Sequence, residues 1–138
     1  MADVAVVTSN IGSEVASASP DASTNLGAAV QKNVEVHSGT GGAGVIGITS
    51  GLVEITDSGA ALLTLAAPVA GAPSAGGNDG QRLTIIATTA HAHTVTTPAS
   101  GVQPSSHHII TFAAAYDVVE LEACNGAWVV LYSTTTQS

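Results

Sequence analysis

From residue 34 to the C-terminus, the sequence consists of short runs typical of β-strands, separated by Gly, Pro, Asn and Asp. Such runs are typical of all-β domains, and no long stretch repeats apolar residues at helical spacing. The expected strands lie at residues 34–38, 45–49, 52–56, 60–66, 81–89, 92–97, 107–113, 118–124 and 127–133. The pattern predicts a small antiparallel β-sandwich, with a jelly-roll-like or barrel-like arrangement as alternatives.

Residues 1–33 differ from the rest of the chain. An apolar start, Val4-Ala5-Val6-Val7, is followed by an Ala- and Ser-rich stretch at residues 16–23. A segment with so few large apolar side chains does not bury enough surface to fold alone. We therefore expect an extended N-terminal arm at 1–33, either disordered when free or docked on a neighbour, and a β domain at 34–138. The start of the arm has the pattern of a strand that could pair with a partner's sheet edge.

The charge balance excludes several classes of partner. Lys32 and Arg82 are the only basic residues besides histidine in the 138-residue chain, against 10 Asp and Glu residues, and the formal net charge is -8. Nucleic acid and anionic membrane surfaces are bound through clustered Lys and Arg, so neither is expected as a partner. Metabolites that carry phosphate or carboxylate are excluded on the same ground.

Cysteine content and the N-terminus bear on the compartment. Cys124 is the only cysteine, which excludes an intrachain disulfide and a thiolate zinc site. The start, Met1-Ala2-Asp3, lacks the basic residues of a signal peptide. No apolar run approaches the ~20 residues of a membrane helix. We expect a soluble chain made in a cytoplasm.

Large side chains are scarce. Aromatic residues make up 3% of the chain and charged residues 9%, against a usual charged share of about 25%. The hydrophobic share of 45% therefore comes mostly from small residues. A core built from them is thin, so we expect part of the apolar surface to be covered by other copies or by another protein.

The last two expected strands meet at Asn125-Gly126, a pair that favours a two-residue type I′ turn because both positions take positive φ. The resulting register pairs residues 124 with 127, 123 with 128, 122 with 129, 121 with 130, 120 with 131 and 119 with 132. One face then carries only apolar side chains: Val119, Leu121, Ala123, Trp128, Val130 and Tyr132. The other face mixes acidic and apolar side chains, which suits a surface partly covered between subunits: Glu120, Glu122, Val129 and Leu131.

Histidines are the candidates for a metal site. On a strand, His91 and His93 project from one face, whereas His107 and His108 point to opposite faces. Strand pairing could bring His93 near His107 or His108, as in a site built from His and carboxylate. No HExxH motif or spaced acid accompanies them. We therefore predict no metal and interpret them as polar or interface histidines, which would make assembly sensitive to pH if they titrate between about pH 5 and 8.

No motif indicates catalysis or cofactor binding. Cys124 has no cation nearby to stabilise a thiolate, and no serine lies in a Gly-x-Ser-x-Gly motif. The glycines at 39, 41 and 44 have the spacing of a dinucleotide fingerprint, but a strand pattern follows, so we interpret them as a flexible loop. Glu120 and Glu122 lack flanking aromatic side chains that would bind a sugar. We predict that the chain is not an enzyme and has no cofactor.

Several strings resemble small virion proteins of tailed bacteriophages. They are NDGQRLTII at residues 78–86, TTAHAHTVT at 88–96, IITF at 109–112 and LEACNGAWVV at 121–130. The resemblance covers roughly residues 55–133. In such proteins the corresponding strands and a closing NG-x-W hairpin form the β domain. Similar strings occur in capsid decoration (cement) proteins and in head- or tail-fibre domains.

Resemblance to decoration proteins implies a structural role. Such proteins are short β domains, often trimers at three-fold positions of the shell, whose N-terminal arm clasps the major capsid protein. We therefore expect a homotrimer on the outer capsid surface of a virion, made in the host cytoplasm. Val4, Val6 and Val7 are the expected capsid contacts of the arm.

Resemblance to fibre domains leaves an alternative open, a head- or tail-fibre module that binds host surface glycans. That role needs exposed aromatic side chains. We expect Trp128, Leu121 and Val119 to lie in the core and stabilise the fold. Tyr116 is then the candidate aromatic side chain for binding a glycan.

Overall fold

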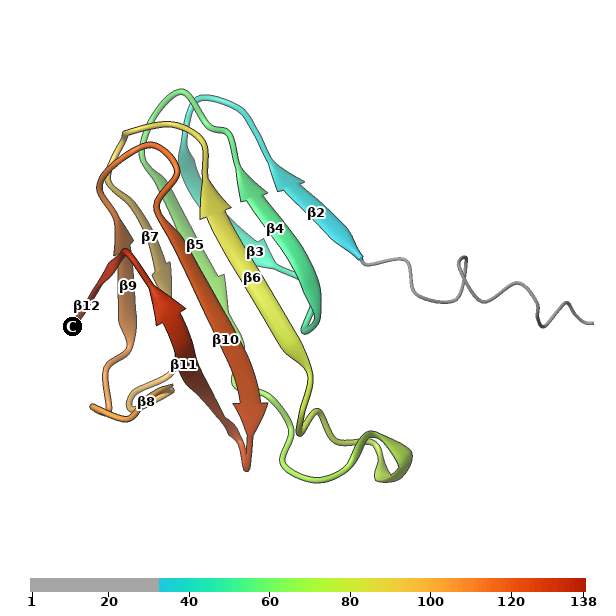
Figure 1. Cartoon of the computed structure of the whole chain (residues 1–138). Helices are drawn as coiled ribbons and strands as arrows, with labels where there is room; N and C mark the ends of the chain where they lie inside the picture. Colours follow the sequence, from blue (N-terminus) through green and yellow to red (C-terminus); the bar gives the residue numbers. More distant parts are fainter. Residues whose placement is uncertain (1–32) are drawn as a thin grey trace, which may run out of the picture. The chain divides into compact units, whose positions relative to one another are not determined.

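The computed structural model describes residues 33–138 and contains two β-sheets that pack face to face (Figure 1). The predicted all-β sandwich is therefore confirmed. Val4, Val6 and Val7, the predicted arm contacts, lie outside the described residues. The described part contains no helix long and apolar enough to cross a membrane.

A six-stranded sheet and a five-stranded sheet make up the two layers. The six-stranded sheet contains, in spatial order, β2 (Val34–His37), β4 (Gly51–Ile55), β6 (Arg82–Ala87), β10 (Val118–Cys124), β11 (Ala127–Ser133) and β8 (Val102–Gln103). The five-stranded sheet contains β12 (Thr136–Gln137), β9 (Ile109–Phe112), β7 (His93–Thr96), β5 (Ala61–Leu65) and β3 (Gly42–Ile46). A short 3-10 helix at Pro73–Ala75 lies in the loop before β6.

The chain crosses to the facing sheet after almost every strand, and the sheets are consequently mixed. β2, β4 and β6 run parallel in one sheet, and β3, β5 and β7 run parallel in the other. Antiparallel pairing enters where β9 joins β7 and β10 joins β6. The prediction of antiparallel strands is therefore wrong for the first half of the domain. The sequence does not distinguish the two cases, because apolar alternation and turn residues are the same whether a loop connects neighbouring strands of one sheet or crosses to the facing sheet.

The core lies between the sheets and is formed by the inward-facing residue of each alternating pair. Its largest members are fully buried: Trp128, Phe112, Ile55, Leu83, Ile85, Ile110 and Leu121. Val119 is buried as well, so the structural role predicted for Trp128, Leu121 and Val119 is confirmed. The Trp128 indole also donates a hydrogen bond from Nε1 to the Ala66 carbonyl at 2.9 Å.

The predicted closing hairpin is confirmed near its turn and wrong further away. Asn125 and Gly126 both have positive φ, and the predicted pairs hold from Cys124↔Ala127 to Leu121↔Val130. The register then shifts, so that Glu120 pairs with Tyr132 and not with Leu131. This β-bulge turns Tyr132, predicted to face the core, outward, where it is 55% exposed.

The glycine-rich segment before β3 is tied down, in contrast to the predicted flexible loop. Gly41 N–H donates to the Asp57 carboxylate at 3.3 Å, and the Gly39 carbonyl accepts from Ser58 N–H at 2.9 Å. Gly42 and Gly44 belong to β3 itself, which begins three residues before the predicted strand 45–49. The short strands β8 and β12 were not predicted, because two residues carry no periodicity.

Candidate interaction surfaces

His93 is the one fully buried histidine among residues 33–138. Its hydrogen bonds, all within the fold, give it a structural role. The side chain is fully buried at the start of β7. Its Nδ1 accepts from Ala61 N–H at 3.1 Å, so Nε2 carries the proton and bonds the Thr89 hydroxyl at 2.9 Å. Thr89 in turn donates to the Asp57 carbonyl at 2.6 Å. Burial removes the ring from water and lowers the pKa of His93, although Thr89 and Asp57 act in the opposite direction.

The other histidines do not join His93 as the metal-site hypothesis required. His91 is exposed and precedes β7, because Ala92 adopts φ 52° and breaks the strand; the prediction that His91 and His93 share a strand face is wrong. β7 and β9 pair antiparallel with His93 opposite Phe112, which leaves His107 and His108 at the other end of the pair. Within residues 33–138, no group of three or more His, Cys, Asp or Glu side chains is placed to hold a metal.

The outer face of the six-stranded sheet carries three of the four acidic side chains of its strands. Glu54, Glu120 and Glu122 lie there beside apolar neighbours. Glu122 pairs with Arg82 at 3.7 Å between Oε2 and Nε, an exposed contact that contributes little to stability. The mixed acidic and apolar face predicted for the closing hairpin is present near the turn, where Glu122 lies opposite Val129, but beyond the bulge Tyr132 takes the predicted place of Leu131 opposite Glu120.

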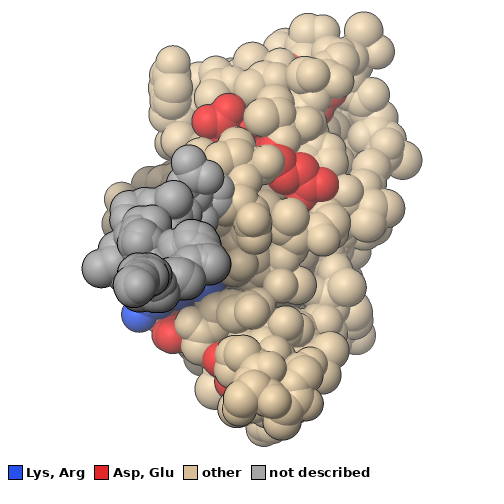
Figure 2. Space-filling view, turned by 90° about the vertical axis from the view of Figure 1, so that its right-hand side faces the viewer, with Lys and Arg blue, Asp and Glu red and all other residues tan. Residues whose placement is uncertain are grey.

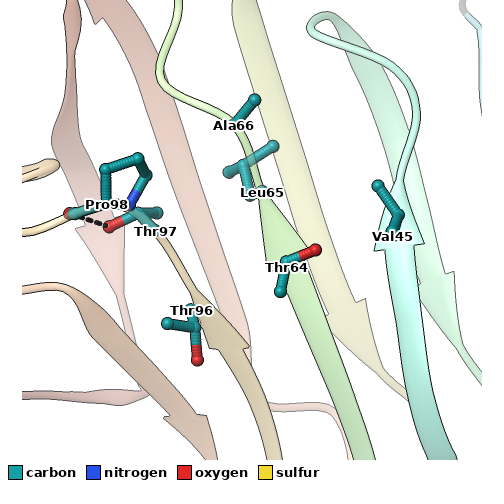
Figure 3. A pocket seen from close by; sticks show the side chains of 7 residues that line it. All are labelled: Val45, Thr64, Leu65, Ala66, Thr96, Thr97 and Pro98. Atoms are coloured by element: carbon teal, nitrogen blue, oxygen red, sulfur yellow. Dashed lines mark hydrogen bonds between the residues drawn. The ribbon is translucent and has the colours of Figure 1, made fainter.

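The outer face of the five-stranded sheet, by contrast, carries no formal charge. None of its strands contains Asp, Glu, Lys or Arg. Thr94, Thr111 and Thr136 form a row across β7, β9 and β12. Beside this row, at the ends of β3, β5 and β7, lies a shallow hollow of about 330 Å³ (Figure 3). Its lining is uncharged: Val45, Thr64, Leu65, Ala66, Thr96, Thr97 and Pro98.

β2 and β3 are the edge strands of the two sheets at one end of the sandwich, which we call the open end. Their outward side chains Val34, Val36 and Val45 are 60%, 53% and 68% exposed. Figure 2 views the domain from this side, where most of the described surface carries no charge and the acidic side chains form small clusters. The open end therefore combines two strand edges with exposed valines on the outer faces of the sheets beside them.

Two inward-facing polar side chains close the core at the open end. The Glu35 carboxylate accepts from Gly47 N–H at 3.0 and 3.1 Å and so links β2 to the loop after β3. His37 lies 3.7 Å from Glu35, measured between Nε2 and Oε2, and this buried Nε2 has no hydrogen-bond partner. The sequence pattern missed both roles, because Glu35 and His37 occupy strand positions that a closed sandwich would fill with apolar residues.

Exposed tyrosines lie where β10 and β11 meet the loops at one end of the sheet. Tyr116 is 71% exposed, in the turn before β10, and Tyr132 is exposed near the end of β11. Asp117 fixes this turn by accepting from the backbone N–H groups of Ala113 and Ala114, both at 2.8 Å. Hydrogen bonds from Ala114 and then from the Thr134 hydroxyl lower the pKa of Asp117.

Comparison with known proteins adds no family assignment. Protein-family models give no match to the chain, and no curated protein sequence matches it significantly.

Proposed function

We propose that this chain is a structural virion protein: a decoration protein that binds the outer surface of a phage capsid as a homotrimer and stabilises it. The strings that resemble phage virion proteins correspond to β6, β7, β9 and the β10–β11 hairpin, which lie side by side in the two sheets. In this role the protein adds contact area between capsid subunits and so opposes the internal pressure of packaged DNA. It performs no chemistry.

The observation that carries the proposal is the apolar surface on regular strands. Val34, Val36, Val45 and Leu62 are each more than half exposed, at 53% or above, on or beside the open end. Val34 and Val36 form one exposed apolar cluster, on the outer face of the six-stranded sheet, and Val45 and Leu62 form another, on the outer face of the five-stranded sheet. Exposed apolar clusters of this kind mark sites of protein contact. A net charge of -8 opposes binding to DNA, so these clusters suit contact with protein, in the shell or in another copy of the chain, and not with the packaged DNA.

Copy number in particles tests the role. Virions from the source are purified, and this chain is quantified against the major capsid protein by mass spectrometry. We expect a ratio near one, as for a protein that covers the whole shell. A few copies per particle would move the chain to a fibre or tail, and absence from particles would reject a virion role.

A variant of the arm tests how the protein binds. Replacing Val4, Val6 and Val7 together with Ser should weaken binding to undecorated capsids at least about tenfold, because the apolar contacts assigned to the arm are lost. Val69→Ser, at a 59% exposed position in the loop before β6, is the matched control and should bind as the wild type does. Unchanged binding of the triple variant would reject the arm as the capsid contact.

Two exposed tyrosines favour a second candidate function, a fibre module that binds host glycans. Aromatic side chains provide stacking surfaces for sugars, and Tyr116 and Tyr132 are both exposed. In a glycan-array experiment this function predicts binding that Tyr116→Ala and Tyr132→Ala abolish. Absence of binding to any glycan would eliminate it.

A further inference from the structure

The open end leaves main-chain groups without partners among residues 33–138. In a parallel strand, alternate residues turn their N–H and C=O groups toward opposite neighbours. On β2, the carbonyls of Asn33 and His37 accept hydrogen bonds from the β4 side, from Leu52 at 2.8 Å and Thr56 at 2.7 Å. The corresponding groups of Val34 and Val36 therefore point away from the sheet.

The edge of β3 repeats this arrangement. Gly42 donates its N–H to the Ala60 carbonyl at 2.8 Å, on the β5 side. The N–H and C=O groups of Ala43 and Val45 therefore point away from the five-stranded sheet. Among the described residues, both sheets thus have main-chain groups without a partner at the same end of the sandwich.

Neither edge carries the usual protection against pairing. Exposed sheet edges are commonly blocked by Pro, Lys, bulges or very short strands. At the opposite ends of the sheets, the edge strands β8 and β12 have 2 residues each. β2 and β3 have 4 and 5 residues, without Pro, Lys or Arg. The one inward-facing carboxylate of these strands, Glu35, accepts a hydrogen bond from Gly47 N–H and therefore does not block pairing at the edge.

Charge and strand direction indicate which molecule covers the open end. Glu35 is the only carboxylate in β2 and β3, so two copies of an acidic chain can meet here without opposing carboxylates at the edges. β2 and β3 run in opposite directions, since the chain turns back as it passes between sheets (Figure 1). Rotation of one copy about an axis along the strands therefore sets its β3 antiparallel to β2 of the next copy.

We propose that the open end joins copies of this chain in a closed ring, with β2 of each copy paired antiparallel with β3 of the next. A register with Val34 opposite Val45, and Val36 opposite Ala43, uses every outward-facing main-chain group of these residues. Apolar side chains then meet across the new pair, and Glu35 lies opposite Gly44, which has no side chain to oppose it. Ring closure leaves neither edge unpaired. The number of three copies per ring rests on the proposed function, whereas the strand pairing is argued from the sheet edges alone.

Proline substitution with light-scattering detection of mass tests the pairing. Val36→Pro combined with Val45→Pro removes two outward N–H groups and leaves the bonds to β4 and β5 in place. We expect the wild type at about three times the 13.5 kDa chain mass and the double proline variant at the chain mass. The matched control, Val36→Ala with Val45→Ala, keeps the N–H groups and should remain assembled. A wild type that is monomeric, or a proline variant that keeps the wild-type mass, would overturn the pairing.

Hydrogen exchange on the unaltered protein provides a test that does not depend on a variant folding. Pairing between copies should slow exchange of the Val36 and Val45 amides at least about tenfold as protein concentration rises through the assembly range. Fast exchange at all concentrations would overturn the proposal, and slow exchange without concentration dependence would assign the edges to a segment of the same chain. Assembled protein that fails to bind capsids would reject the decoration role and leave the pairing intact.

Discussion

At the scale of single residues, His93 shows how a polar side chain is accommodated in an apolar core, which consists mostly of Ile, Leu and Val and not of the small residues that dominate the composition. Both ring nitrogens are bonded, to Ala61 N–H and to the Thr89 hydroxyl, so burial leaves no polar atom unpaired. The neutral ring suits this site because Nδ1 must accept a hydrogen bond. Protonation would convert Nδ1 into a donor facing another donor, the Ala61 N–H.

This arrangement predicts that acid destabilises the fold. The pKa of folded His93 lies below the 6.5 expected of the unfolded chain, mainly because burial removes the ring from water. The contribution of His93 to stability is therefore complete above about pH 6.5 and declines as the pH falls below it, where the unfolded state takes up the proton first. Urea unfolding at about pH 7.5 and 5.5 should show the loss. Further loss through Asp117 is expected only below its ordinary pKa of 3.8.

Two histidine variants identify the group responsible. His93→Gln should lower stability at pH 7.5 but show a smaller change on acidification than the wild type. His91→Gln, at an exposed position 6.0 Å away between ring centroids, should retain the wild-type change. If His93→Gln lost as much stability in acid as the wild type, the effect would belong to other groups.

Trp128 is the largest fully buried side chain. Trp128→Phe should lower the free energy of unfolding by about 1–3 kcal/mol, because it leaves a cavity and removes the donor to the Ala66 carbonyl. Tyr132→Phe, at an exposed position on the same strand, should change it by less than about 0.5 kcal/mol. Urea unfolding measures both, and equal effects would contradict the burial of Trp128.

At the scale of elements, successive strands alternate between the two sheets, so the loops that connect the sheets lie next to one another and pack closely. The connection before β3 passes the one before β5 at Gly41, where an added Cβ would lie 2.6 Å from the Ala60 carbonyl oxygen. Gly42, next in sequence, also has positive φ, but an added Cβ there would meet nothing within 4 Å. Comparing substitutions at the two glycines therefore separates two contributions to stability: the cost of a positive φ, which both share, and the steric clash, which only Gly41 has.

Alanine at each glycine measures this contact. Both substitutions should cost about 1–2 kcal/mol for the positive φ. Gly41→Ala should cost at least about 1 kcal/mol more, because backbone atoms cannot move aside as a flexible side chain can. Urea unfolding of both variants gives the difference, and equal losses would show that the two connections do not pack as closely as the structure has them.

At the scale of the whole molecule, charge sets how copies approach one another. The net charge of -8 repels copies at long range, whereas the two edges of the open end carry a single carboxylate, Glu35, which faces inward. Raising the salt concentration from about 0.01 M to 0.15 M shortens the screening length from roughly 30 to 8 Å. The dissociation constant of the assembly should therefore fall, as sedimentation equilibrium can measure. Weaker assembly in salt would indicate contact through ion pairs instead.

The sequence by itself determined the features that depend on neighbouring residues. Alternation located nearly all of the longer strands, Asn125-Gly126 defined the closing turn, and Trp128 was assigned to the core, because local backbone preferences and side-chain period act within a few residues. The shortage of Lys and Arg likewise supports a prediction that needs no structure, namely that anionic partners do not bind.

Only the tertiary structure decided which strands become neighbours. The parallel order, the bulge that turns Tyr132 outward and the burial of His93 depend on contacts between residues far apart in the chain. A strand pattern gives each side chain a face but not a partner strand, since main-chain hydrogen bonds are nearly indifferent to sequence. The open end follows from this same choice, because only the order of strands in the two sheets leaves β2 and β3 at their edges.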